Sequence, residues 1–245
     1  MNSCFRFHRL SLGIALLCTC LAAPLHAGKV YLKPGKPNGL ELLPPPPPPG
    51  SPEETADLDV VRSVHNSRIA DADAKAVAEG DFDIFVFAPA IGPFFQPDLP
   101  KTKAFFEEIS GEVEVIAKQL KNIYKRPRPC DIDPSLQEGP APRSYGYPSR
   151  HATLGTVDAM ILIKLFPKKQ DAIFSLGRSL GWHRVILGRH YPTDIFAGRV
   201  LGRAIYHELL KSETFKGNLA EVAAELKAAN SSTSTKHDIK ASSVN

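Results

Sequence analysis

The chain has 245 residues, 43% of them hydrophobic, which suffices for one domain with a buried core and is ordinary for a globular protein. Its 30 Lys and Arg residues against 26 Asp and Glu residues give a formal net charge of +4. This surplus is too small and too evenly spread to indicate a nucleic-acid partner. Any case for an anionic ligand therefore depends on local clusters of charge.

The first 27 residues have the pattern of a bacterial export signal. Arg6 and Arg9 give a positive start, residues 10–23 form an apolar stretch, and residues 25–27, Leu-His-Ala, suit a cleavage site. We therefore expect residues 1–27 to be removed and the mature protein to be periplasmic or secreted, without stable insertion in a membrane. An uncleaved anchor is the weaker alternative, because about 14 apolar residues fall short of the roughly 20 that span a bilayer. A lipoprotein signal ending at Cys20 is a third option.

Three of the four cysteines lie in this segment, so cleavage leaves only Cys130. A single cysteine cannot form an intramolecular disulfide, and the fold must then be stabilised by its core. Burial is the common outcome for a free cysteine. Pairing between chains is the alternative, so a homo-oligomer stays open.

The sequence divides into an arm, a domain and a tail. Residues 28–50 are rich in proline and end in six consecutive prolines, residues 44–49, which favour an extended polyproline conformation. This arm is either a spacer between the signal and the domain, or a segment that lies on the folded body or near the mouth of a pocket. Residues 230–245 are polar, rich in Ser and Thr, and are expected to be disordered. The folded domain is therefore expected to span residues 51–229.

Helical periodicity fills this domain, and no segment shows the sustained alternation of a half-buried strand. The first helix begins with Ser51 as cap, Pro52 at the first helical position and Glu54 completing a capping box, and is expected to reach about residue 79. The sequence predicts an all-α fold in a single-domain helical bundle. The further helices expected cover about residues 105–121, 151–166, 170–187, 193–210 and 218–229.

Two smaller features belong to this prediction. Gly198 and Gly202 lie one turn apart, a spacing that favours close contact of their helix with a neighbour. Residues 84–88 are apolar but too few to decide between a strand and a helix.

Cations and histidines gather in three segments at expected helix boundaries, residues 121–129, 147–151 and 183–194. Helix starts expose free amide donors and a partial positive charge, so the residues just after Pro148 and Pro192 suit an anion. A phosphate held there would need cations to neutralise the charge on its equatorial oxygens.

Lys121, Arg128 and Arg184 could converge on such a phosphate. Taken one at a time, however, cations are mostly solvated surface, and a histidine on a helix is more often packed or exposed than catalytic. The residues therefore indicate a site only in combination.

His190 and Asp194 also have two structural interpretations. They could form a helical pair at spacing i, i+4, or contribute with His151 to a metal site. Pro192 argues against both, because it places a helix start between the two residues. The sequence shows no paired carboxylates or His/Asp clusters of the metallophosphatase type, so no metal site is predicted.

In combination, the three segments resemble the signature of the phosphatidic acid phosphatase type 2 (PAP2) superfamily, which includes bacterial class A acid phosphatases and vanadium haloperoxidases. The family pattern reads Lys-x6-Arg-Pro, then Pro-Ser-Gly-His, then Ser-Arg-x5-His-x3-Asp. Arg150 departs from it by replacing the glycine, and His183 by replacing the serine. The matching positions, in order, are Lys121, Arg128, Pro129, Pro148, Ser149, His151, Arg184, His190 and Asp194.

The resemblance implies a helical bundle of the class A acid phosphatase and vanadium haloperoxidase type that hydrolyses small phosphomonoesters of broad specificity without a metal or other cofactor. His190 would attack phosphorus and form a phosphohistidine, Asp194 would fix the His190 tautomer, and His151 would act as general acid and then as base. The implied phosphate-binding residues are Lys121, Arg128, Ser149, Arg150 and Arg184.

Three other functions stay open. A vanadium-dependent haloperoxidase would hold vanadate on His190 in the same cradle. A lipid phosphate phosphatase is a second alternative, although integral members of that group need several spanning helices and none is expected after residue 27. A phosphate-binding protein without turnover could use the same cations.

Overall fold

The structure is a computed structural model that describes residues 30–69 and 83–242, with side chains described as far as Ser232. The predicted export signal, residues 1–27, lies outside the described residues, as do residues 70–79 of the first predicted helix. In the described part of the chain, no helix combines the length and the apolar character needed to cross a membrane.

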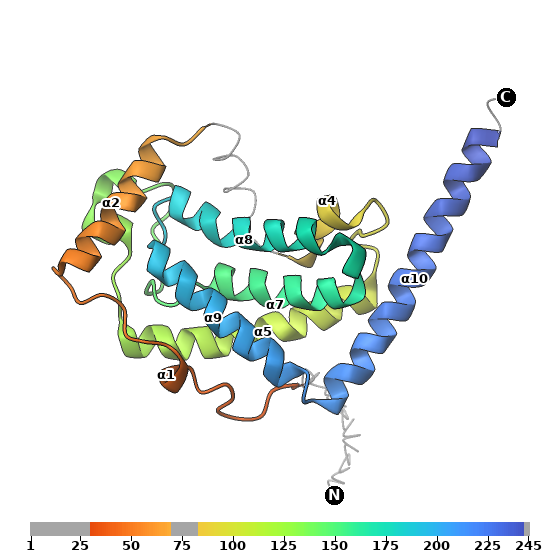
Figure 1. The fold of residues 1–245 in the computed structure, drawn as a ribbon, viewed down its shortest axis with the longest axis horizontal. Helices are drawn as coiled ribbons and strands as arrows, with labels where there is room; N and C mark the ends of the chain where they lie inside the picture. The colour runs from red at the N-terminus through yellow and green to blue at the C-terminus, as the bar shows by residue number, and fades with distance from the viewer. Residues whose placement is uncertain (1–29, 70–82, 243–245) are drawn as a thin grey trace, which may run out of the picture.

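The fold is all-α, as predicted, and the described residues contain no strand. Helix α7 is central and packs against α5, α8 and α9, which lie around it in Figure 1. The first turns of α10 pack on α5. The helices are α1 Gly39–Leu42, α2 Pro52–Asn66, η2 Ile84–Phe87, α4 Ala88–Ile91, α5 Pro100–Tyr124, α6 Pro129–Ile132, η3 Pro134–Leu136, α7 Arg150–Leu165, η4 Pro167–Lys169, α8 Gln170–Ile186, α9 Pro192–Leu209 and α10 Glu213–Ser242.

Glycines allow α7 to approach its neighbours closely. A Cβ on Gly198 would lie 2.5 Å from the Ser149 carbonyl oxygen, and one on Gly202 would lie 2.7 Å from the Thr153 carbonyl oxygen. The close helix contact predicted from these two glycines is therefore confirmed. Gly177 has the same role between α8 and α7. These contacts hold the start of α9 against the start of α7.

The arm lies on the folded body rather than acting as a spacer, at least over its described residues. The backbone N–H groups of Tyr31 and Leu32 each donate to the Glu112 carboxylate at 2.8 Å, and both residues are buried. Near the end of the arm, the Tyr147 hydroxyl donates to the Pro44 carbonyl oxygen at 2.6 Å. The arm thus braces the loop that leads into α7.

Two helix lengths differ from the prediction. Helix α2 ends at Asn66 rather than near residue 79. Its C-cap, Ser67, leaves the α-helical conformation with φ −96° and ψ 5°, and the Ser67 hydroxyl donates to the Ser63 carbonyl oxygen at 2.7 Å. Helix α10 continues to Ser242, where a disordered tail was predicted from residue 230 (Figure 1). No Gly or Pro interrupts residues 218–242. The Ser231 and Ser232 hydroxyls also donate to carbonyls four residues earlier, at 3.0 Å.

Gly198→Ala should destabilise the protein, because its Cβ meets the backbone of α7 and packed helices do not separate freely. We expect a loss of about 1–3 kcal/mol in the free energy of unfolding, measured by urea titration. Gly217→Ala is the matched control, since a Cβ there has nothing within 4 Å. It should be neutral or stabilising by about 0.5–1 kcal/mol. Equal urea midpoints for the two variants would contradict the close contact.

Candidate active site

A pocket of about 280 Å³ opens where the ends of α5 and α8 meet the start of α7 and the turn before α9. It collects most of the predicted site residues, and it adds several that the motifs did not indicate. The predicted residues that line it are Lys121, Arg128, Arg150, His151, Arg184 and His190. The additional lining residues are Glu114, Pro140, Pro142, Ser144 and Arg189.

A tight turn between α8 and α9 positions His190. Gly188 has φ +64°, and a Cβ there would lie 2.5 Å from the Leu136 carbonyl oxygen, so the turn requires glycine. The His190 N–H donates to the Arg184 carbonyl oxygen at 3.2 Å, and Pro192 then begins α9. His190 lies before the helix and is 2% exposed. Its pairing with the α9 side chain four residues later is therefore not an ordinary pair along one helix face.

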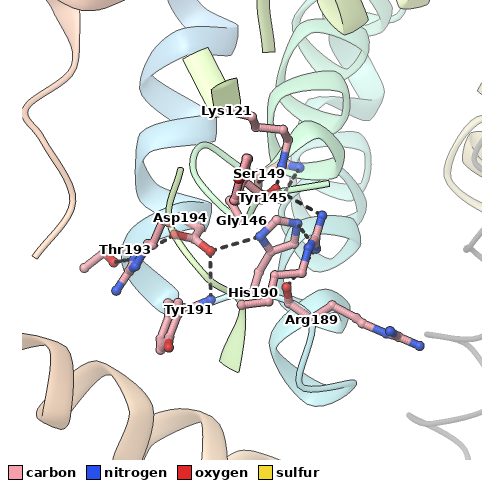
Figure 2. Close-up of polar contacts among 12 residues, drawn as sticks. Lys121, Tyr145, Gly146, Ser149, Arg189, His190, Tyr191, Thr193 and Asp194 are labelled. Atoms are coloured by element: carbon pink, nitrogen blue, oxygen red, sulfur yellow. Dashed lines mark hydrogen bonds and ion pairs between the residues drawn. The ribbon is translucent and has the colours of Figure 1, made fainter. Parts of the chain in front are cut away.

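The His190 ring is fixed at both nitrogens. Nδ1 lies 3.0 Å from Oδ2 of Asp194, and Nε2 lies 3.1 Å from NH1 of Arg128. The Asp194 carboxylate also accepts hydrogen bonds from the Tyr191 N–H at 3.1 Å and from Arg126, as expected of an ionised group (Figure 2). Nδ1 therefore carries the hydrogen and donates it to Asp194. Nε2 keeps its lone pair and faces the Arg128 donor.

The surroundings keep this ring neutral. Burial lowers the pKa of His190 well below 6.5, and the positive charges of Arg128 and Lys121 lower it further. Burial raises the pKa of the Asp194 carboxyl, while the Arg126 guanidinium opposes that rise. The lowered pKa thus favours a neutral His190 ring whose Nε2 is unprotonated.

Two cations beside this nitrogen are held by backbone carbonyls. Lys121 Nζ donates to the carbonyl oxygens of Tyr145 at 2.5 Å and Gly146 at 3.1 Å (Figure 2). Arg128 Nε donates to the Ser144 carbonyl oxygen at 2.7 Å. Burial, followed by the charge of Arg128, lowers the pKa of Lys121 to about 7. Desolvated cations that have only neutral partners are a favourable environment for an anion.

Two predicted phosphate ligands have other partners. Arg150 lines the pocket, but its guanidinium forms an ion pair with Glu114 and donates to the Ser110 hydroxyl at 3.2 Å. Ser149 is fully buried, caps α7, and donates its N–H to the Asp194 carbonyl oxygen at 3.0 Å. Ser149 therefore joins the two helix starts behind the pocket, and Arg150 occupies its rim.

The other residues that the sequence singled out differ in whether they line the pocket. Arg184 lines the pocket, whereas the neighbouring His183 does not. Cys130 is buried. In the described ranges, no three His, Cys, Asp or Glu side chains are grouped so that they could hold a metal ion.

Arg126 is the main site residue that sequence reasoning missed. It is 3% exposed, and its guanidinium donates to Asp194 at 2.6 Å and to Asp57 at 2.9 Å. It also lies 3.8 Å from the centre of the Tyr191 ring, a cation–π contact. One feature could have indicated that Asp57 has a cationic partner. Asp57 lies on the buried face of α2 beside Leu58, where a carboxylate needs a partner.

Comparison with known proteins finds a family that part of this chain matches. Residues 109–216 match the PAP2 superfamily. The matched part, which is less than half of the chain, contains all three segments in which cations and histidines gather. The predicted resemblance is thereby confirmed at the level of the superfamily.

Several curated proteins are similar to this chain. A non-specific acid phosphatase of Salmonella typhimurium is 29% identical over 58% of this chain and 59% of its own length. A non-specific acid phosphatase of Providencia stuartii is 28% identical over 65% of this chain and 66% of its own length. The match thus spans about three fifths to two thirds of these relatives. An undecaprenyl-diphosphatase of Sulfolobus acidocaldarius is 31% identical over 36% of this chain and 44% of its own length.

Among solved structures, a transmembrane PAP2-type phosphatidylglycerolphosphate phosphatase from Bacillus subtilis superimposes with a TM-score of 0.46 and 19% identity. The superposition covers 64% of this chain and 84% of that one.

Arg126→Gln should strongly destabilise the protein, because it leaves two buried carboxylates without their shared cation. Removal of one partner of a buried ion pair costs about 3–5 kcal/mol, which urea unfolding would measure. Exposed Arg143→Gln is the control and should stay within about 0.5 kcal/mol of the parent.

Asp57→Asn keeps the Arg126 contact to Asp194 and should cost about 1–3 kcal/mol, so it provides a milder test if Arg126→Gln does not fold. Arg126→Gln with the stability of the parent would show that the network contributes nothing.

Proposed function

We propose that this protein is an acid phosphatase that hydrolyses small phosphate monoesters of broad specificity through a phosphohistidine on His190. The observation that carries the proposal is the fixed His190 ring. Its Nδ1 is held by Asp194 at 3.0 Å, and its Nε2 faces a pocket lined by cations. Relatives named non-specific acid phosphatase support the same reaction class.

In the first step, Nε2 of His190 attacks phosphorus, so an N–P bond forms while the ester P–O bond breaks. His151, which lines the same pocket, donates a proton to the leaving oxygen. The phosphorylated ring becomes cationic, and the Asp194 carboxylate on Nδ1 stabilises that charge. Lys121 and Arg128 neutralise the charge that develops on the equatorial oxygens.

In the second step, water attacks phosphorus as His151 removes its proton, and the N–P bond breaks to release phosphate and the free ring of His190. The side-chain cations already supply the charge neutralisation that a metal ion would give. We therefore propose a metal-independent reaction. The export-signal pattern of residues 1–27 supports a periplasmic or secreted location.

A lipid phosphate is the second candidate substrate. Besides the undecaprenyl-diphosphatase, a lipid A 4'-phosphatase of Bacteroides thetaiotaomicron is 32% identical over 35% of this chain. Rates on phosphatidate in micelles and on nucleoside monophosphates separate the two. We expect a higher kcat/KM for the nucleotides, because the lining of the pocket is mostly polar and charged.

Purified protein should hydrolyse p-nitrophenyl phosphate, and His190→Ala should reduce the rate to background, because no nucleophile remains. EDTA should leave the parent rate unchanged. Exposed His207→Ala removes a histidine outside the pocket and should keep full activity. Activity that survives His190→Ala, or that EDTA abolishes, would contradict the proposal.

Anion affinity should fall as the pH rises through about 7, because Lys121 then loses its proton. Sulfate is a suitable probe, since it stays a dianion throughout, and its inhibition constant should increase above that pH. Lys121→Arg keeps its charge and should retain affinity at pH 8. If Lys121→Arg lost affinity for sulfate above that pH as the parent does, another group would control anion binding.

A further inference from the structure

A second hollow, larger than the catalytic pocket, runs along α7 between α8 and α9, the three helices that lie side by side in Figure 1. Its volume is about 560 Å³, within the usual range of about 300–1,000 Å³ for small-molecule sites. It shares no lining residue with the catalytic pocket. We call this hollow the α7–α9 groove.

The groove has an apolar interior and exposed aromatic side chains. Met160 and Ile163 of α7 and Val200 of α9 contribute aliphatic surface. Phe174 of α8 is 44% exposed and Phe196 of α9 is 67% exposed, and both line the groove. Single exposed apolar residues are common, but two phenylalanines facing one apolar hollow indicate a binding surface.

Cations also line the groove, and they lack counterions within the described part of the chain. Lys164, Arg178, Arg199 and Arg203 line it together with no acidic residue. Of the ion pairs among described residues, none involves these four side chains. These four positive charges lie beside an apolar surface, and no acidic side chain among the described residues forms an ion pair with them.

Two of the arginines are close neighbours. Arg199 NH2 donates to the Arg178 backbone carbonyl oxygen at 3.2 Å, and the Arg178 guanidinium lies 5.6 Å from the centre of the Phe174 ring. Burial and the charge of Arg178 both lower the pKa of Arg199. An anion bound between these two side chains would relieve this repulsion and accept charge-assisted hydrogen bonds.

We propose that the α7–α9 groove binds one anionic lipid, with its head group on Arg178 and Arg199 and its chain on Met160, Ile163 and Val200. Charge complementarity selects an anionic head, and the apolar interior selects a hydrocarbon chain. A small inorganic anion would leave the apolar surface exposed, and a neutral hydrocarbon would leave the arginines unpaired. This binding is separate from catalysis, because the two sites share no residue.

Laurate tests the proposal on the full chain, because a carboxylate amphiphile cannot be a phosphatase substrate. Isothermal titration calorimetry should show one laurate per chain. The double variant Arg178→Gln/Arg199→Gln should bind it at least about tenfold more weakly, since each lost tenfold corresponds to about 1.4 kcal/mol. Met160→Trp should weaken binding by filling the interior. Laurate should not compete with p-nitrophenyl phosphate.

The matched control is Lys118→Gln/Lys227→Gln, which removes two exposed charges outside the groove and should bind laurate within about twofold of the parent. Four results of the binding and inhibition measurements would overturn the proposal. They are no binding by the parent, equal loss in the control, dodecanol bound as tightly as laurate, and competitive inhibition by laurate. A dimer in light scattering that Phe196→Asp dissociates would also overturn it, because a second copy would then cover the groove.

Discussion

The candidate site depends on the hydrogen bonds that one buried residue, Asp194, accepts. Its side chain accepts hydrogen bonds from the His190 ring and from Arg126, while its backbone carbonyl accepts from the Ser149 N–H. One residue thus connects the reactive ring, the segment after α5 and the start of α7. Because Asp194 is 0% exposed, its charge must be neutralised inside the protein. Arg126 meets that need and also binds Asp57 of α2.

The pocket beside His190 differs from the surroundings of Asp194, because its lining carries an excess of positive charge. Lys121 and Arg128 are buried and are held largely by carbonyl oxygens. Burial, followed by the charge of Arg128, lowers the pKa of Lys121 to about 7, and carbonyl dipoles compensate a buried cation less well than a carboxylate would. A phosphate group would supply the missing negative charge. A bound anion would thus reduce the excess of positive charge. Burial, and after it the charges of Arg128 and Lys121, also lowers the pKa of His190.

The sequence predicted the long helices because apolar residues such as Ile109 and Val113 recur at helical spacing and become buried in α5. It also placed His190 near Asp194, because a proline begins a helix between them. It did not predict Arg126, whose partner Asp57 is 69 positions away, since local patterns do not encode distant pairings.

The ion pair of Arg150 with Glu114 was also missed, because Glu114 lies in another helix. Where the glycine of the family pattern would leave space, this chain has an ion pair that lines the entrance to the pocket. This ion pair takes no part in the proposed reaction, in which His190 is the nucleophile.

The most direct measurement mixes the protein rapidly with a monoester carrying radiolabelled phosphate, stops the reaction in alkali during turnover, and locates the label in the chain. The account predicts label on His190, and none in His190→Ala. Label on any other residue, or turnover with no labelled protein, would contradict it.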